Sequence, residues 1–169
     1  MNITLIVAMD QDRGIGFQNT IPWMGKIPSD MKHFRETTTG HPVIMGRNTY
    51  LSMGKALKNR TNIVLSNSPE FTASDGVVAP SFCEALKHAS DAMGRDEIFI
   101  IGGTQTYKTA LPFADKIMIT LVEGQFETDT YFPEIDMSKW TTVSEQKIPI
   151  NERDLFALHL ITLIRKTAL

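Results

Sequence analysis

One carboxylate stands out in a segment that otherwise mixes apolar, aromatic and basic residues. Trp23–Phe34 reads WMGKIPSDMKHF, and Asp30 falls in the first turn of a helix predicted over Ser29–Thr38. Residues four apart share one helix face, so Asp30 and Phe34 should point the same way, with Met31 beside them. A carboxylate on an apolar face is costly to bury unless something pairs with it. A ligand bearing a row of N–H donors would be such a partner.

Two glycine-containing turns indicate a second binding function. Ile44–Thr49 and Ile100–Thr104 each run from an apolar strand into a predicted helix. In a parallel sheet both turns fall at the carboxyl ends of strands, where open α/β folds bind ligands. Glycine lets a phosphate approach the backbone, and a helix N-terminus offers free N–H groups. Arg47 adds a fork of donors. The two turns could hold a pyrophosphate between them; the alternative is a tight turn beside a solvated arginine.

Other chemistries find little support in the sequence. Gly14-Ile15-Gly16 follows a strand but lacks the third glycine of the dinucleotide-binding fingerprint, and no helix begins there. No pair among the four histidines has metal-ligand spacing, so we expect no metal site. No Ser-His-Asp or Cys-His arrangement is apparent. Cys83 is the only cysteine, which excludes an internal disulfide, and we expect it to be a small core residue.

Alternating strands and helices are predicted along the chain, and these elements would position Asp30 and the two glycine turns. We expect strands at Ile3–Met9, Val43–Met45, Asn62–Leu65, Val77–Ala79, Glu97–Ile101, Lys116–Leu121, Trp140–Glu145 and Leu155–Ile164. We expect helices at Ser29–Thr38, Arg47–Met53, from the Ser81 capping box to about Met93, and at Thr104–Ala110. This order predicts an α/β fold: a mostly parallel central sheet with an antiparallel C-terminal edge hairpin and flanking helices. No linker or repeat is visible, so residues 1–169 should form a single domain.

The segment Asp10–Pro28 is too rich in glycine and proline to be one regular element. It nevertheless contains Ile15, Ile21 and Trp23, which are costly to leave in water. Long irregular loops in compact domains are usually either functional or disordered. A mobile cover over a ligand would explain both facts, and a surface loop held by a few apolar anchors is the alternative.

The overall composition narrows the range of partners. The formal net charge is −2, so there is no electrostatic signature for nucleic acid or an anionic membrane. The apolar N-terminal run has no preceding basic region or cleavage site and is interpreted as a buried strand. No apolar run approaches membrane-spanning length. We therefore expect a cytoplasmic protein with a small-molecule substrate.

Taken together, these motifs resemble dihydrofolate reductase of the bacterial chromosomal type. The resemblance covers nearly the whole chain from Ile3 to about Tyr131, and more loosely the remainder. Its matching segments are Val7-Ala8, Gly14-Ile15-Gly16, Ile21-Pro22-Trp23, Pro28-Ser29-Asp30, Phe34, Val43–Arg47, Thr49, Arg60, Asn62, Ile101-Gly102-Gly103, Tyr107, Thr120 and Asp129–Pro133. The family reduces 7,8-dihydrofolate to tetrahydrofolate with NADPH, usually as a monomer, and is the target of antifolate inhibitors.

The resemblance implies a role for each matching residue in the folate site. Asp30 should hold the 2-amino group and N3 of the pteridine, while Trp23 and Thr120 should order water near it. Arg60 should pair with the α-carboxylate of the glutamyl tail. The apolar walls and the pocket where the two rings meet should be formed by Ala8, Met31, Phe34, Met53, Leu57 and Ile101.

The resemblance also implies a cofactor site, with a cis peptide between its two adjacent glycines. Its expected residues are Ala8, Ile15, Gly16, Arg47, Asn48, Thr49, Leu65, Ser66, Asn67, Gly102, Gly103, Thr104, Gln105 and Tyr107. Asp10–Pro28 corresponds to the mobile active-site loop of the family, and Asp129 to a residue that latches its closed form near Gly16.

Three departures from the family pattern affect these expectations. The active-site loop holds two extra residues around Met24-Gly25-Lys26. Gln105 replaces an arginine that often supports the adenosine 2′-phosphate, which leaves Arg47 as the obvious partner and could weaken the preference for NADPH over NADH. The segment Ile148–Asp154 does not match the last loop of the family and receives no role.

Two other functions remain as alternatives. A reductase of the same fold that acts on a pyrimidine intermediate of riboflavin synthesis would not need Asp30, Phe34 or Arg60. An inactive folate- or nucleotide-binding module would be expected to lose Asp30, Trp23 or the glycine pair, and the sequence retains all of them.

Overall fold

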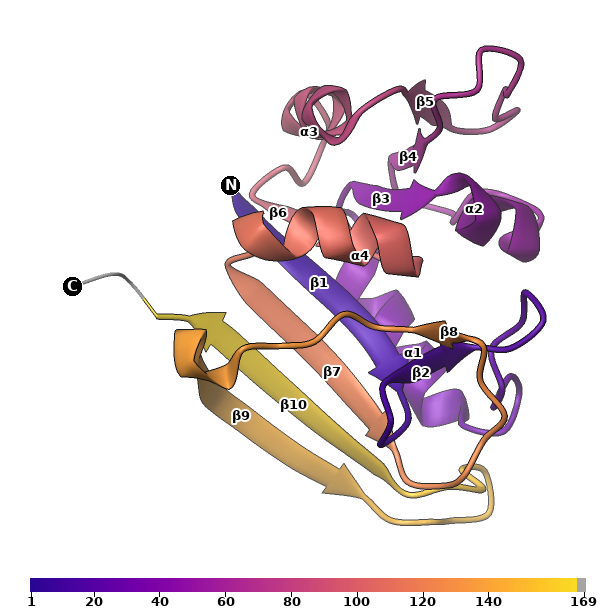
Figure 1. Cartoon of the computed structure of the whole chain (residues 1–169), viewed down its shortest axis with the longest axis vertical. Helices are drawn as coiled ribbons and strands as arrows, with labels where there is room; N and C mark the ends of the chain where they lie inside the picture. Colours follow the sequence, from indigo (N-terminus) through magenta and orange to yellow (C-terminus); the bar gives the residue numbers. More distant parts are fainter. Residues whose placement is uncertain (167–169) are drawn as a thin grey trace.

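A computed structural model describes residues 1–166 of the chain. Its backbone is organised around one eight-stranded sheet with the order β5-β4-β3-β6-β1-β7-β10-β9. The six strands from β5 to β7 are parallel, whereas β10 is antiparallel to both β7 and β9. The predicted α/β class, with its antiparallel C-terminal hairpin, is confirmed (Figure 1).

The strands of this sheet are β1 Asn2–Met9, β3 Val43–Gly46, β4 Asn62–Leu65, β5 Val77–Ala79, β6 Glu97–Ile100, β7 Lys116–Val122, β9 Trp140–Ile148 and β10 Leu158–Arg165. A separate short pair, β2 Gly14–Gly16 and β8 Thr130–Tyr131, is antiparallel. The helices are α1 Pro28–Thr38, α2 Arg47–Met53, α3 Phe82–Ser90 and α4 Thr104–Ala110, with 3-10 turns at Leu111–Phe113 and Met137–Lys139.

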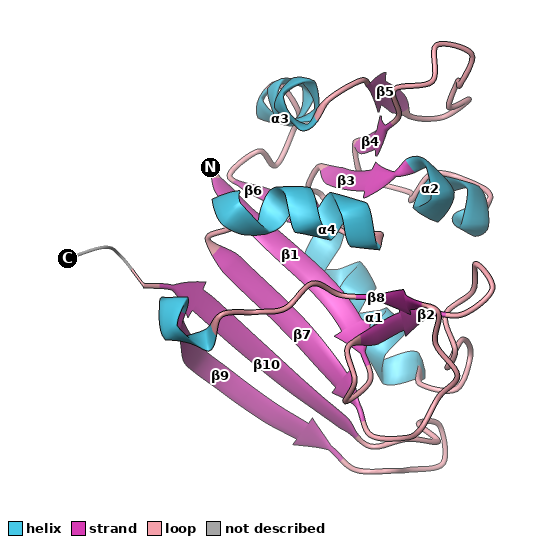
Figure 2. Cartoon of the chain, in the orientation of Figure 1, coloured by secondary structure: helices cyan, strands magenta, loops and turns pink. Residues whose placement is uncertain are grey.

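Helices cover both faces of the sheet. In Figures 1 and 2, α4 crosses in front of β1, and α1 lies behind the sheet near the carboxyl end of β1. The pair β2–β8 lies in front, close to that same end. The carboxyl ends of the parallel strands are therefore surrounded by α1, the β2–β8 pair and the starts of α2 and α4.

The core is built mainly from strands that are apolar on both faces. Leu5, Ile44, Ile63, Ile98 and Ile117 are fully buried in the central strands. Continuous apolar runs are typical of parallel strands covered by helices on both sides. Strand β9, at the edge, instead exposes most of its residues, as expected for a strand with a solvent-facing surface.

Several element boundaries differ from the sequence-based predictions. Helix α3 ends at Ser90, not near Met93. Asp91 is its C-cap residue, and a series of turns leads from there to β6. The Ser81 side chain does accept the Glu84 N–H at 3.2 Å, as the capping box predicts. The prediction that Cys83 is a core residue is wrong, because Cys83 lies on the exposed side of α3.

The hairpin strands at the C-terminus also differ from prediction. Strand β9 extends to Ile148, and β10 begins at Leu158, not at Leu155. Residues Thr141–Lys147 of β9 are all exposed, so no alternation of apolar and polar residues marks the length of this strand. Among the described residues, no helix is long and apolar enough to cross a membrane.

Candidate active site

Asp30 lies in the first turn of α1, as the sequence predicts. Its carboxylate is partly buried, and burial raises its pKa. A hydrogen bond with the Thr120 side chain and the neighbouring His33 act in the opposite direction, while the carboxylate of Asp154 adds to the rise. The pKa of Asp30 is therefore raised overall, because the cost of desolvating the charged form outweighs the favourable contacts.

An apolar wall continues from the helix face that carries Asp30, because Phe34 lies one turn further along that face. Phe34 on α1, Met53 on α2, Leu57 and Ile101 pack against one buried cluster that includes Tyr50. These four residues were predicted to line a single pocket, and the structure brings them together. Met31 lies outside this cluster and is 42% exposed.

Arg60 lies against the same wall. Its guanidinium carbon is 6.0 Å from the centre of the Phe34 ring, and its Nη1 donates to the Thr38 hydroxyl at 2.8 Å. Its Nε donates to the carbonyl of Lys58 at 3.0 Å. These contacts hold a cation at the end of the apolar wall opposite the start of α1.

The active-site loop closes over the start of α1. Trp23 is 1% exposed and packs edge-on against Phe126, with ring centres 4.9 Å apart. Ala8, at the end of β1, packs against the same cluster. A cavity of about 10 Å³ lies between this loop and α1, lined by Ile21, Trp23, Met24, Gly25, Ile27, Asp30 and Met31. That volume is close to the smallest that holds one water molecule.

Hydrogen bonds fasten this loop at several points. The Asp10 carboxylate accepts the Gly14 N–H at 2.7 Å. Asp129 accepts the Gln18 N–H at 2.9 Å, and its own N–H donates to the carbonyl of Gly16 at 2.9 Å. A Cβ on Gly14 would lie 2.4 Å from the Thr128 side chain, so only glycine fits there. The predicted contact between Asp129 and Gly16 is thus present.

The two glycine turns meet at the carboxyl edge of the sheet. The Gly46 N–H donates to the carbonyl of Gly102 at 2.7 Å, and the peptide between Gly102 and Gly103 is cis, as the resemblance implies. A Cβ on Gly46 would lie 2.9 Å from the Thr106 hydroxyl. Within the described chain, no side chain caps α2 or α4. This leaves first-turn N–H groups of both helices available to a phosphate.

Several predicted cofactor residues surround these turns. Arg47 is exposed, with its guanidinium carbon 5.2 Å from the centre of the Phe71 ring. The Thr104 hydroxyl donates to the carbonyl of Tyr131 at 2.6 Å, and the Gln105 amide donates to the Thr109 hydroxyl at 3.5 Å. Asn48 and Thr49 occupy the first turn of α2, and Leu65, Ser66 and Asn67 lie at and just after the end of β4.

Two predicted cofactor residues are also part of the core. Tyr107 is 4% exposed, and its hydroxyl donates to the carbonyl of Ile6 at 2.7 Å. Burial, followed by the charge of Asp30, raises the pKa of this hydroxyl. Ile15, in β2, packs against the main core. The Tyr107 ring also lies against Gly102, where an added Cβ would be 3.3 Å from it, and the Tyr107 hydroxyl is already engaged.

The sequence analysis missed the contribution of the β9–β10 loop. Asp154 is 1% exposed and accepts two hydrogen bonds from Ser29, next to Asp30. The only sequence signal was a carboxylate in a loop that matched no family motif. In residues 1–166, no group of three or more histidine, cysteine, aspartate or glutamate side chains is arranged to hold a metal ion.

Comparisons with known proteins agree with this geometry. A family model described as dihydrofolate reductase matches residues 2–165. The type 3 dihydrofolate reductase of Salmonella typhimurium is 38% identical over 166 residues, covering 98% of this chain and 99% of that protein. Dihydrofolate reductase of Bacillus subtilis is 36% identical, covering 98% and 96%.

A solved structure has the same fold. Dihydrofolate reductase from Enterococcus faecalis, complexed with NADP(H) and RAB-propyl, has a TM-score of 0.91 and 34% identity, covering 98% of this chain and 97% of that one. The fold and its sheet-edge site are those of an α/β oxidoreductase. The chain belongs to the dihydrofolate reductase family.

The raised pKa of Asp30 predicts that this carboxylate lowers stability at neutral pH. Below the ordinary value of 3.8 the side chain is protonated in both folded and unfolded chains. As pH rises towards the raised folded pKa, the unfolded chain loses its proton first, so stability falls. We expect Asp30→Asn to unfold at a higher urea concentration than wild type at pH 7, with the difference shrinking towards pH 4.

Glu36→Gln is a matched control on the same helix. Glu36 forms only an exposed pair with Lys32, at 3.9 Å, and such pairs contribute little. This variant should unfold near the wild-type midpoint at both pH values. A less stable Asp30→Asn at pH 7 would contradict a net cost of ionising Asp30.

Proposed function

We propose that this chain reduces 7,8-dihydrofolate to 5,6,7,8-tetrahydrofolate with NADPH, for use in one-carbon metabolism. The observation that carries the proposal is a partly buried Asp30 beside the apolar wall of Phe34, Met53, Leu57 and Ile101. Such an arrangement suits a flat ring with N–H donors on one edge. The monomeric state, the cytoplasmic location and the single-domain organisation over residues 1–169 stay predictions from the sequence.

Asp30 would bind the pteridine through its 2-amino group and N3. Paired N–H donors compensate the cost of burying the carboxylate, and charge-assisted hydrogen bonds are stronger than neutral ones. Trp23 and Thr120 adjoin Asp30, and the small cavity between the loop and α1 has room for one water. These residues would order a water that brings a proton to the ring.

The carboxyl edge of the parallel strands carries groups that would bind NADPH. Uncapped first turns of α2 and α4, together with glycine at positions 46, 102 and 103, would receive its pyrophosphate. Arg47 would pair with the 2′-phosphate, and Ala8, Ile15 and Gly16 would adjoin the nicotinamide. When bound, NADPH supplies the hydride that reduces the ring. The loop fastened by Asp129 would exclude water from this reaction.

Loss of absorbance at 340 nm with dihydrofolate tests the function directly. We expect rapid loss with NADPH and a kcat/KM about tenfold or more lower with NADH, the worth of one charged hydrogen bond. Arg47→Ala should remove most of that preference, whereas Lys108→Ala, at an exposed position on α4, should retain it. No loss with either cofactor would overturn the proposal in favour of the riboflavin-pathway reductase or an inactive binding module.

Asp30→Asn should abolish most dihydrofolate turnover at pH 7. An amide cannot accept from the two ring donors as a carboxylate does, and it cannot exchange a proton. We expect the dissociation constant for NADPH, measured by fluorescence quenching, to stay near the wild-type value. Turnover of Asp30→Asn at the wild-type rate would remove Asp30 from its proposed role.

Arg60→Ala should raise the KM for dihydrofolate more than tenfold, because it removes a charged partner of the glutamyl carboxylate. The KM for a reduced pterin without the glutamyl tail should rise little by comparison. Lys58→Ala, an exposed neighbour in the same turn, serves as the control and should leave both KM values unchanged. Equal effects of Arg60→Ala on the two substrates would exclude Arg60 from the tail site.

A further inference from the structure

Helix α1 begins without a capping side chain of its own. Its N-cap residue is Ile27, whose side chain cannot accept a hydrogen bond. The first turn of a helix leaves backbone N–H groups that need an acceptor. The residue at the second helical position is Ser29, which directly precedes Asp30.

Asp154, from the β9–β10 loop, supplies the missing acceptor. One carboxylate oxygen accepts the Ser29 N–H at 2.9 Å, and the other accepts the Ser29 hydroxyl at 2.5 Å. An N-cap side chain normally accepts from the N–H at the second or third position of its own helix. Asp154 makes this same bond although it lies 125 residues away in sequence.

The β9–β10 loop holds this carboxylate in place. Asn151 donates its amide to Asp154 at 2.9 Å and accepts the backbone N–H groups of Arg153 and Asp154. Next to it, the Leu155 N–H donates to the carbonyl of Lys26 at 2.8 Å. The loop therefore contacts the last part of the active-site loop and the first turn of α1 at adjacent positions.

We propose that Asp154 is a positioning residue for Asp30: it caps α1 from outside the helix and sets the charge environment in which Asp30 meets the substrate. The proposal rests on the function proposed above for Asp30. Asp154 would not touch the substrate and would act through Ser29 and the first turn of α1.

Charge gives Asp154 an effect that a neutral cap would lack. The positive end of a helix favours a negative side chain in its first turn and so lowers the pKa of that side chain. Asp154 occupies this end with its own negative charge, and it thereby opposes ionisation of Asp30. Burial disfavours ionising Asp154 itself, but hydrogen bonds from Ser29 and Asn151 and the charge of Arg153 outweigh it and lower its pKa. Asp154 is therefore an anion at neutral pH.

The other groups that act on Asp30 are few among the described residues. His33 lies on α1, and the Thr120 side chain on β7 hydrogen-bonds to Asp30. Tyr107 on α4 is a buried phenol with a raised pKa, so it is neutral. Asp154 is the one other carboxylate among these groups, and it raises the pKa of Asp30.

The test is the pH dependence of hydride transfer in a single turnover, with NADPH and dihydrofolate bound. The reaction consumes a proton, so its rate falls as pH rises through the apparent pKa of the substrate site. Asp154→Asn keeps the size of the side chain and removes its charge. We expect this fall to move about 0.2–0.7 units towards lower pH, the shift that corresponds to one charge at a helix end.

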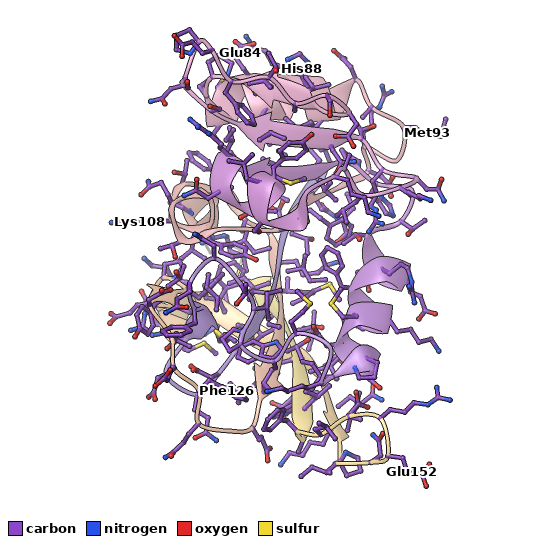
Figure 3. The ribbon with its side chains drawn as sticks, turned by 90° about the vertical axis from the view of Figure 1, so that its right-hand side faces the viewer. Glu84, His88, Met93, Lys108, Phe126 and Glu152 are labelled. Atoms are coloured by element: carbon purple, nitrogen blue, oxygen red, sulfur yellow. The ribbon has the colours of Figure 1, made fainter. Side chains whose placement is uncertain are left out.

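Glu152→Gln is the matched control. Glu152 belongs to the same loop and is exposed, and Figure 3 shows it extending away from α1. It should give the wild-type profile. An unshifted profile in Asp154→Asn, an equal shift in Glu152→Gln, or a fall in rate with no shift in the profile would each overturn the proposal.

A second variant decides the matter if Asp154→Asn does not fold. Ser29→Ala removes the hydroxyl bond and keeps the backbone bond. We expect kcat/KM for dihydrofolate to fall up to about tenfold, the worth of one hydrogen bond, with an unchanged NADPH dissociation constant. A wild-type kcat/KM in Ser29→Ala would then overturn the proposal. If Asp30→Asn itself turns over normally, the failure lies in the proposed function of Asp30, whatever Asp154 does.

Discussion

Parallel pairing of the central strands is the constraint on which the site depends. Because β1, β3, β6 and β7 run in one direction, their carboxyl ends meet at one edge of the sheet. The chain turns where each of these strands ends. The turn after β3 contacts the turn after β6 through a hydrogen bond from the Gly46 N–H to the carbonyl of Gly102. Residues from distant parts of the sequence are therefore brought together at one edge of the sheet.

A second constraint is the electrostatic cost of the carboxylate at the start of α1. Burial raises the pKa of Asp30, and the structure offsets this only in part, through Thr120 and His33. A fully compensated carboxylate would gain little from a ligand. Partial compensation leaves Asp30 able to bind N–H donors strongly, at the expense of stability in the free protein.

The sequence predicted those parts of the site that depend on local patterns. Asp30 in the first turn of a helix and glycine at two strand-to-helix turns both follow from spacing that a reader can check in the chain. The family resemblance added the cis peptide between Gly102 and Gly103 and the contact of Asp129 with the active-site loop. Both are present in the structure.

The parts that escaped prediction depend on tertiary contacts. Cys83 fits an apolar helical pattern, but α3 buries only Ala85 and Ala89 fully and leaves Cys83 exposed. The role of Asp154 depends on a loop that folds back on a helix more than a hundred residues earlier. No periodicity or short motif encodes a contact of that kind, which forms only when the folded chain brings the β9–β10 loop to the start of α1.

The fastening of the active-site loop has a consequence for how it can open. Its two ends are held, by Asp10 and Gly14 at one and by Lys26 and Leu155 at the other, so the chain between them is a short closed loop. Between these ends the chain is also held by the bonds of Asp129 to Gln18 and Gly16, by the β2–β8 pair and by the buried Trp23, so all of these contacts must break before it opens. We expect a segment held in this way to unfold as one cooperative unit while the sheet beneath it stays folded.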